Sequence, residues 1–127
     1  MATGFEVPQV THADVVRVVA REFPQTAALA VLSLLRPLQN LVQPEATDDQ
    51  NARFHLAILK LAEGQLDRIS ELLSVANLDF RDVLSPAEYP GFMANGGFVG
   101  ADRLKASERM QLIQRDWEQY HEWLHRT

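Results

Sequence analysis

Apolar side chains recur every three to four residues along most of this 127-residue chain, and that spacing places them on one face of an α-helix. No segment alternates between apolar and polar positions with a period of two, so we expect no sheet. The pattern predicts helices at about residues 13–22, 24–36, 48–63, 65–84 and 102–125. The predicted fold class is therefore all-α: an antiparallel bundle of four to five helices, formed as a single domain over residues 1–127.

The first two predicted helices have recognisable boundaries. Thr11 suits the N-cap of the first helix, and Asp14 stands where a capping box places its acidic partner. Pro24 suits the first turn of the second helix. The run of residues 27–35 in that helix is apolar on nearly every side. Such a helix is either buried all round or offers one side to a partner.

Three segments are predicted to lie outside helices. Residues 1–10 are expected to be a flexible N-terminus, and residues 37–49, which begin with a proline, a linker. Residues 89–100 contain four glycines and form a predicted loop that Phe92, Met93 and Phe98 should pin to the body; this loop is also a candidate lid. Gly64 is placed at the end of the third helix, where a left-handed backbone is needed.

The fourth and fifth predicted helices each carry a heptad stripe, and we expect the two stripes to face each other. Ser85 and Pro86 should end the fourth helix. Trp123 lies off the stripe of the last helix and is expected to be an exposed anchor. The first stripe consists of Leu66, Ile69, Leu73, Ala76, Phe80 and Val83, and the second of Ala106, Met110, Ile113, Trp117, Tyr120 and Leu124.

Composition and charge narrow the class of protein. A hydrophobic content of 46% with 23% charged residues is typical of a globular chain. The net charge of −5 argues against a nucleic-acid partner, because phosphate binding needs a concentrated basic face. The nearest approach to such a face is Arg17, Arg21 and Arg36, of which Arg17 and Arg21 are expected to form an exposed pair. We therefore expect a protein partner or self-association.

The expected location is the cytoplasm. The chain has no cysteine, which excludes disulfides and thiolate metal sites and fits a reducing compartment. Residues 1–10 lack the basic start and apolar stretch of a signal peptide. No window approaches the ~18 uninterrupted apolar residues of a membrane span, so no membrane association is predicted.

The polar-dense segment around residues 79–90 is the first candidate site. Its carboxylates could bind a cation or a basic partner, or position an acid–base pair. In a purely structural alternative, Asp79 or Asp82 pairs with an arginine of the last helix such as Arg115, and Tyr89 ties down the loop. The candidate cluster consists of Asp79, Arg81, Asp82, Glu88 and Tyr89.

A second candidate matches the HExxH pattern at residues 121–125. Two histidines four residues apart share a helix face and can bind zinc, with the glutamate as a base. A catalytic zinc needs a third protein ligand, however, and only two residues follow the motif in this sequence. Metal binding through His121, Glu122 and His125 is therefore a weak alternative, and no cofactor is predicted. Arg53, His55 and Lys60 form a third group, in which His55 should edge the core.

Three segments resemble a group of short, uncharacterised bacterial proteins. They read RFHLAILKLAEG at residues 53–64, DFRDVLSPAEYP at 79–90 and DWEQYHEWL at 116–124. The resemblance covers about the C-terminal two thirds of the chain and implies a bacterial source and a helical fold. It implies no catalytic activity and assigns no site residues.

These observations favour a small non-enzymatic protein that acts as an interaction, accessory or regulatory domain. The apolar surplus of residues 29–35 and the heptad stripes suit helix–helix association, including a homodimer. The first alternative is an enzyme or small-ligand binder that uses the cluster from Asp79 to Tyr89. The second is a metal-binding protein that uses His121 and His125.

Overall fold

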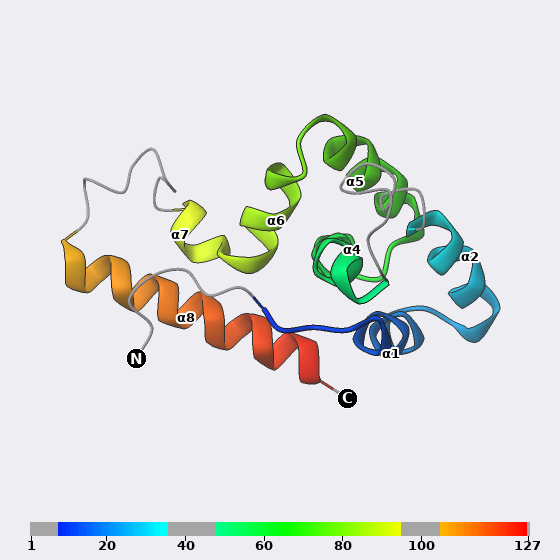
Figure 1. Cartoon of the computed structure of the whole chain (residues 1–127), viewed down its shortest axis with the longest axis horizontal. Coiled ribbons are helices and arrows are strands. Elements are labelled where there is room, and N and C mark those ends of the chain that lie inside the picture. Colours follow the sequence, from blue (N-terminus) through cyan, green and yellow to red (C-terminus); the bar gives the residue numbers. More distant parts are fainter. Residues whose placement is uncertain (1–7, 36–47, 95–104, 127) are drawn as a thin grey trace.

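A computed structural model gives the architecture of the chain (Figure 1) and describes residues 8–35, 48–94 and 105–126, with the backbone alone for residues 48–50. Every regular element in these ranges is a helix, and they contain no strand, which confirms the all-α prediction. The helices are α1 (His12–Glu22), α2 (Gln25–Leu35), α4 (Asp48–Ala62), α5 (Leu66–Leu78), α6 (Arg81–Glu88), α7 (Pro90–Ala94) and α8 (Ala106–His125).

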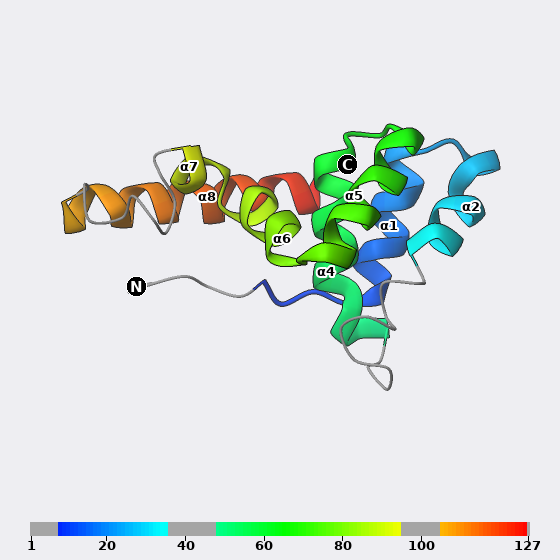
Figure 2. The same ribbon diagram turned by 90° about the horizontal axis from the view of Figure 1, so that it is seen from above.

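Helix α4 lies at the centre of the body and packs against α1, α5 and α6 (Figures 1 and 2). Its apolar positions fall on several faces, so it is buried on most sides. Each fully buried leucine or isoleucine there contributes about 1.5–3 kcal/mol to folding. The fully buried apolar residues of α4 are Ala52, Leu56, Ala57, Ile58, Leu59 and Ala62, and the valines Val15, Val18 and Val19 of α1 join the same core.

Helices α2 and α8 lie at opposite ends of the molecule (Figure 1). α2 packs against α1 and α5, whereas α8 packs against α6 and α7. The carboxyl-terminal half of α8 enters the core through Tyr120 and Leu124. Its amino-terminal half extends away from the body beside α7 (Figure 2). No helix in the described ranges combines the length and apolar character needed to cross a bilayer.

Two locally encoded boundaries are confirmed. At the start of α1 the backbone N–H of Thr11 donates to the Asp14 carboxylate at 2.9 Å, as a capping box requires. At the end of α4 the chain turns through Gly64, whose φ of 75° is left-handed. A Cβ at Gly64 would also lie 3.2 Å from the carbonyl oxygen of Glu22, so the turn fits closely against the end of α1.

The single helix predicted over residues 65–84 is wrong. The chain leaves the helix at Asp79, which has extended φ and ψ of −159° and 108°, and restarts at Arg81. The Asp79 carboxylate accepts the backbone N–H of Arg81 at 3.0 Å, and this local bond competes with continuation of the helix. Pro86 does not end a helix, because α6 continues through it to Glu88. In so short a helix, proline removes one late hydrogen bond.

The two heptad stripes do not face each other, because the break at Asp79 directs α5 toward α2 and α4, whereas α8 packs on α6 and α7. Ile69, Ala76 and Val83 of the first stripe are buried, but Phe80 is 40% exposed. In the second stripe Met110 is 39% exposed. The expected exposure of Trp123 is also wrong, since its side chain is buried in the core.

The predicted non-helical segments are described only in part. Of the expected flexible N-terminus, residues 1–7 lie outside the described ranges; Pro8 is buried and Val10 packs against the core. Of the predicted linker, residues 37–47 lie outside them and residues 48–49 belong to α4. Of the predicted loop, residues 90–94 form α7, and residues 95–100 lie outside the described ranges. The predicted lid role of the loop therefore stays a prediction. Phe92 is buried as expected, and Met93 is partly exposed.

Candidate functional site

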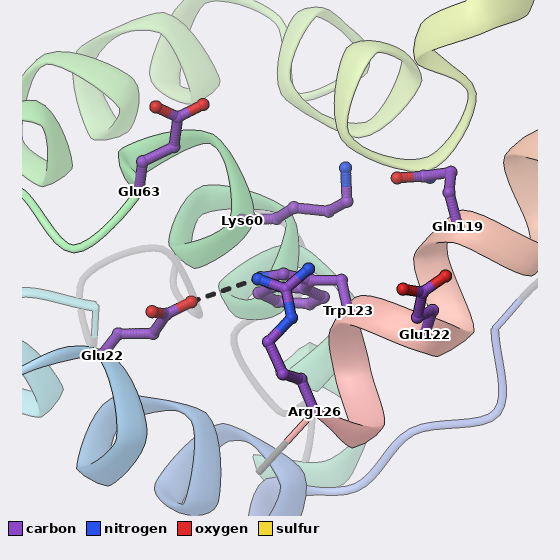
Figure 3. Close-up of a pocket in the computed structure, with 7 residues that line it drawn as sticks. All are labelled: Glu22, Lys60, Glu63, Gln119, Glu122, Trp123 and Arg126. Carbon is purple, nitrogen blue, oxygen red and sulfur yellow. Dashed lines mark hydrogen bonds between the residues drawn. The ribbon is translucent and has the colours of Figure 1, made fainter.

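The carboxyl-terminal ends of α1, α4 and α8 meet around a pocket of about 480 Å³ (Figure 3). None of the residues in the polar cluster predicted at 79–89 takes part in it. Its lining is mainly charged and polar. The lining residues are Glu22 from α1, Lys60 and Glu63 from the end of α4, and Gln119, Glu122, Trp123 and Arg126 from the end of α8.

The pocket has its shape because arginines of α1 hold the end of α8. The Arg21 guanidinium donates to the carbonyl oxygens of Trp123 at 2.7 Å and Arg126 at 2.8 Å, and Arg17 donates to that of Leu124 at 2.9 Å. The last carbonyls of a helix have no intrahelical partner and carry partial negative charge, so cations stabilise them. The expected exposed arginine pair is therefore wrong for Arg21, which is largely buried and serves this contact.

Trp123 forms one wall of the pocket and is held on two sides. Its indole N–H donates to the Glu22 carboxylate at 3.3 Å (Figure 3), and the Arg21 guanidinium lies 5.3 Å from the ring centroid. Arg21 therefore makes both the cation–π contact with Trp123 and the hydrogen bonds to the carbonyls at the end of α8. Glu22 is in turn paired with Arg21 at 3.2 Å. The wall is thus a closed network of three side chains.

Lys60 projects into the pocket from α4 (Figure 3). Among the described residues it forms neither an ion pair nor a hydrogen bond. Burial lowers its pKa, because the ammonium loses hydration, and the charges of Asp116 and Glu63 offset part of this effect. A half-buried cation without a close counter-ion is a candidate for ligand contact.

The structure separates the predicted cluster into an exposed part, with Asp79, Arg81 and Asp82, and a buried part, with Glu88 and Tyr89. Asp79 and Arg81 form an exposed ion pair at 2.9 Å, in which the Arg81 guanidinium lowers the pKa of the Asp79 carboxyl. Asp82 beside them is also exposed. Neither Asp79 nor Asp82 pairs with Arg115 in the described part of the chain. A surface pair of this kind stabilises little and is screened by salt.

Glu88 lies in the interior and forms a two-pronged pair with Arg53 of α4. Arg53 Nε and Nη2 donate to the two carboxylate oxygens, each at 2.8 Å. Glu88 is nearly inaccessible to solvent, and its hydrogen bonds raise the pKa of Arg53. The hydroxyl of Tyr120 is buried without a hydrogen-bond partner in the described residues, and burial raises its pKa. The pair of Arg53 and Glu88 joins α4 to α6.

Tyr89 is buried in a small apolar cluster with Phe92 and Ile113, between α7 and α8. Beside it the carboxylate of Asp116 accepts the backbone N–H groups of Gly91 and Phe92, both at 2.8 Å. Tyr89 thus belongs to the contact that holds α7 on α8. Tyr89 is buried, whereas Asp79 is partly exposed and Arg81 is exposed.

The HExxH residues are not gathered around one point. The His121 ring packs edge-on against Trp117 at 4.3 Å and stacks on His125 at 6.1 Å between centroids. Glu122 lines the pocket instead. In the described ranges no group of three or more histidines, aspartates or glutamates is placed to hold a metal ion. Burial, and then the charge of His125, lowers the pKa of His121. His55 is buried in α4 as a core residue.

The fold defines an all-α protein with a polar pocket at the junction of three helix ends. No family model, no curated protein and no solved structure matches the chain. The resemblance to short bacterial proteins therefore stays a prediction.

Sequence reasoning missed the pocket as a unit. Of its residues, Lys60 belongs to the third predicted group, Glu122 to the predicted metal motif, and Trp123 is predicted to be an exposed anchor. The pocket combines positions near 22, 60 and 120, which no local spacing connects. Two signals are present in the sequence: Lys60, a cation in the apolar second half of α4, and the two arginines of α1 at helical spacing, Arg17 and Arg21.

Proposed function

We propose that this chain is a non-enzymatic protein-interaction domain whose binding surface is the outer side of α2. One observation carries the proposal: α2 is apolar and uncharged along its length, yet only Val31 and Leu35 of it are buried. Leu29 is 78% exposed. A sequence this apolar is expected to be covered on all sides, and a side left open suits a partner surface.

The open side has a consistent composition. Thr26, Leu29, Ala30 and Ser33 are exposed and recur at spacings of three, one and three residues, so they lie on one face. Three of the four are small, which lets another helix approach closely around Leu29. Half-buried Leu32 and Leu34 flank this face. The surface thus offers one large apolar side chain among small ones.

We take the occupant to be a second copy of the chain. A two-fold interface brings the same surface of both copies together, so that surface must not repel itself. The chain carries a net charge of −5, whereas α2 contains no charged residue. α2 is therefore a place where two copies can meet without like-charge repulsion. The same charge argues against nucleic acid as the partner.

The expected dimer is weak. A helix of 11 residues is about 16 Å long, which is short for a stable interface. We therefore expect a dissociation constant in roughly the micromolar range or above.

From the resemblance and the cysteine-free sequence we propose a bacterial cytoplasm as the location of the protein.

Sedimentation equilibrium over a wide concentration range tests this proposal. The wild type should show reversible dimerisation. Leu29→Lys should shift the dissociation constant upward by about tenfold or more, because it places two ammonium groups in the interface. Leu78→Lys is the matched control: Leu78 is 90% exposed at the end of α5, outside α2, and should leave association unchanged.

Two results would overturn the proposal. One is a wild type that stays monomeric at concentrations of about 1 mM. The other is an equal effect of Leu29→Lys and Leu78→Lys on association. Thermal melting of both variants checks that each remains folded, which is expected because both side chains are largely exposed.

A further inference from the structure

Opposite charges line the pocket at the ends of α1, α4 and α8 without pairing with each other (Figure 3). Lys60 and Arg126 are its cations, and Glu63 and Glu122 are carboxylates of the same lining. None of these four side chains forms an ion pair within the described residues. Glu22 is excluded from this set because Arg21 and Trp123 already engage it.

We infer that this pocket binds a small polar zwitterion of the α-amino-acid class. The ligand carboxylate lies toward Lys60 and Arg126, and its ammonium group toward Glu122; the Glu63 carboxylate lies on the other side of the pocket (Figure 3). Charges of both signs line this pocket, half-buried at Lys60 and exposed at Glu63, Glu122 and Arg126, so a ligand with one charge of each sign can contact both kinds. This site is independent of the proposed dimer surface, since no residue of α2 is among those that line it.

Ligands with a single sign of charge fit less well. A phosphate group would meet Glu22, Glu63 and Glu122 as well as three helix ends of partial negative charge. A simple cation would meet Lys60 and Arg126. Either ligand would leave the lining charges of its own sign without a partner. In the free protein, burial lowers the pKa of Lys60. A bound carboxylate would stabilise the charged form of this side chain.

Size and polarity restrict the side chain of the ligand. A volume of about 480 Å³ is in the lower part of the range for small-molecule sites. Gln119 donates its amide N–H to the carbonyl of Asp116 at 2.8 Å. Its amide oxygen is turned toward Lys60 in Figure 3 and is available as an acceptor. The lining thus suits an amino acid with a short or medium polar side chain.

Isothermal titration calorimetry with L-glutamine, L-glutamate and L-arginine tests the ligand class. At least one should bind saturably, with a dissociation constant below about 1 mM. N-acetyl-L-glutamine lacks the ammonium group and L-glutaminamide lacks the carboxylate. If L-glutamine binds, each analogue should bind at least about tenfold more weakly, because each loses one charge-assisted contact.

Variants locate the binding. Lys60→Met keeps the apolar stem and removes the charge, and Glu122→Gln keeps the shape of the side chain. Each should weaken binding by about tenfold or more. Lys105→Met is the matched control, since Lys105 is the other lysine of the chain, exposed at the start of α8 and outside the pocket. It should leave binding unchanged.

The outcomes separate clearly. Absence of saturable heat from all three amino acids at about 10 mM would overturn the inference, as would equal binding of wild type and Lys60→Met. Equal binding of L-glutamine and one of its analogues would mean that the pocket recognises a single charge, and would overturn it too. NMR of the Lys60 side chain gives a second measurement: its pKa should rise when the ligand carboxylate is bound.

Discussion

The carboxylate of Asp116 lies so close to the backbone of Gly91 that a side chain at position 91 would clash with it. Asp116 Oδ1 accepts the Gly91 N–H at 2.8 Å, and a Cβ built on Gly91 would lie 2.8 Å from the same oxygen. Asp116 Oδ2 accepts the N–H of Phe92 at 2.8 Å. One carboxylate on α8 therefore satisfies two backbone donors at the start of α7, provided that residue 91 has no side chain.

Gly91→Ala should detach α7 from α8. We expect the free energy of unfolding to fall by about 1–3 kcal/mol, because the buried carboxylate must move away from both donors. Chemical denaturation measures the change. In an Asp116→Ala background the same substitution should cost much less, since the clashing oxygen is gone. Additive effects of the two substitutions would contradict this account.

Glu88→Gln should destabilise the fold strongly, because it leaves the Arg53 guanidinium without its buried counter-charge. Since Arg53 is partly exposed, we expect a loss of roughly 2–3 kcal/mol in unfolding free energy rather than the full cost of a completely buried pair. Asp79→Asn is the control in the exposed pair with Arg81 and should change stability little. Similar losses for the two variants, measured by urea denaturation, would show that burial does not distinguish the pairs.

Tyr120→Phe should stabilise the protein. The Tyr120 hydroxyl is buried without a hydrogen-bond partner in the described part of the chain, so removing it relieves the desolvation of a polar group. The ring contacts with Trp123 at 5.7 Å and His121 at 5.8 Å do not involve the hydroxyl. We expect a gain of about 1 kcal/mol, measured as a higher melting temperature. A lower melting temperature would mean that the hydroxyl is hydrogen-bonded in solution.

Local signals predicted the parts of the fold that depend on a few neighbouring residues. Thr11 with Asp14 marks the start of α1, and Gly64 marks the turn after α4, because capping boxes and left-handed turns need specific residues at fixed offsets. The break at Asp79 was also local, but a six-member heptad stripe across it favoured a continuous helix. The aspartate side chain that bonds to the Arg81 N–H decides in favour of the break.

The candidate site could not be predicted in the same way, because its contacts join distant positions. Arg21 binds the carbonyl of Trp123, 102 residues further along the chain. That contact reverses the expected exposure of Trp123 and builds a wall of the pocket. Glu88 and Arg53 are 35 residues apart, so spacing alone grouped Glu88 with Asp79 rather than with its partner. Single-sequence periodicity does not specify which of several charged residues pair across the fold.

Stability should fall in mildly acidic solution because of His121. Burial, and then the charge of His125, holds the pKa of His121 below its ordinary value of 6.5. Protonation therefore favours the unfolded chain: the stability from neutral His121 is complete above about pH 6.5 and is lost as the pH falls toward the lowered folded-state pKa. Between about pH 7.5 and 5.5, the melting temperature of wild type should fall more than that of His121→Gln. His125→Gln should reduce this dependence without abolishing it, because burial is the larger cause. An unchanged pH dependence in His121→Gln would assign it to other groups.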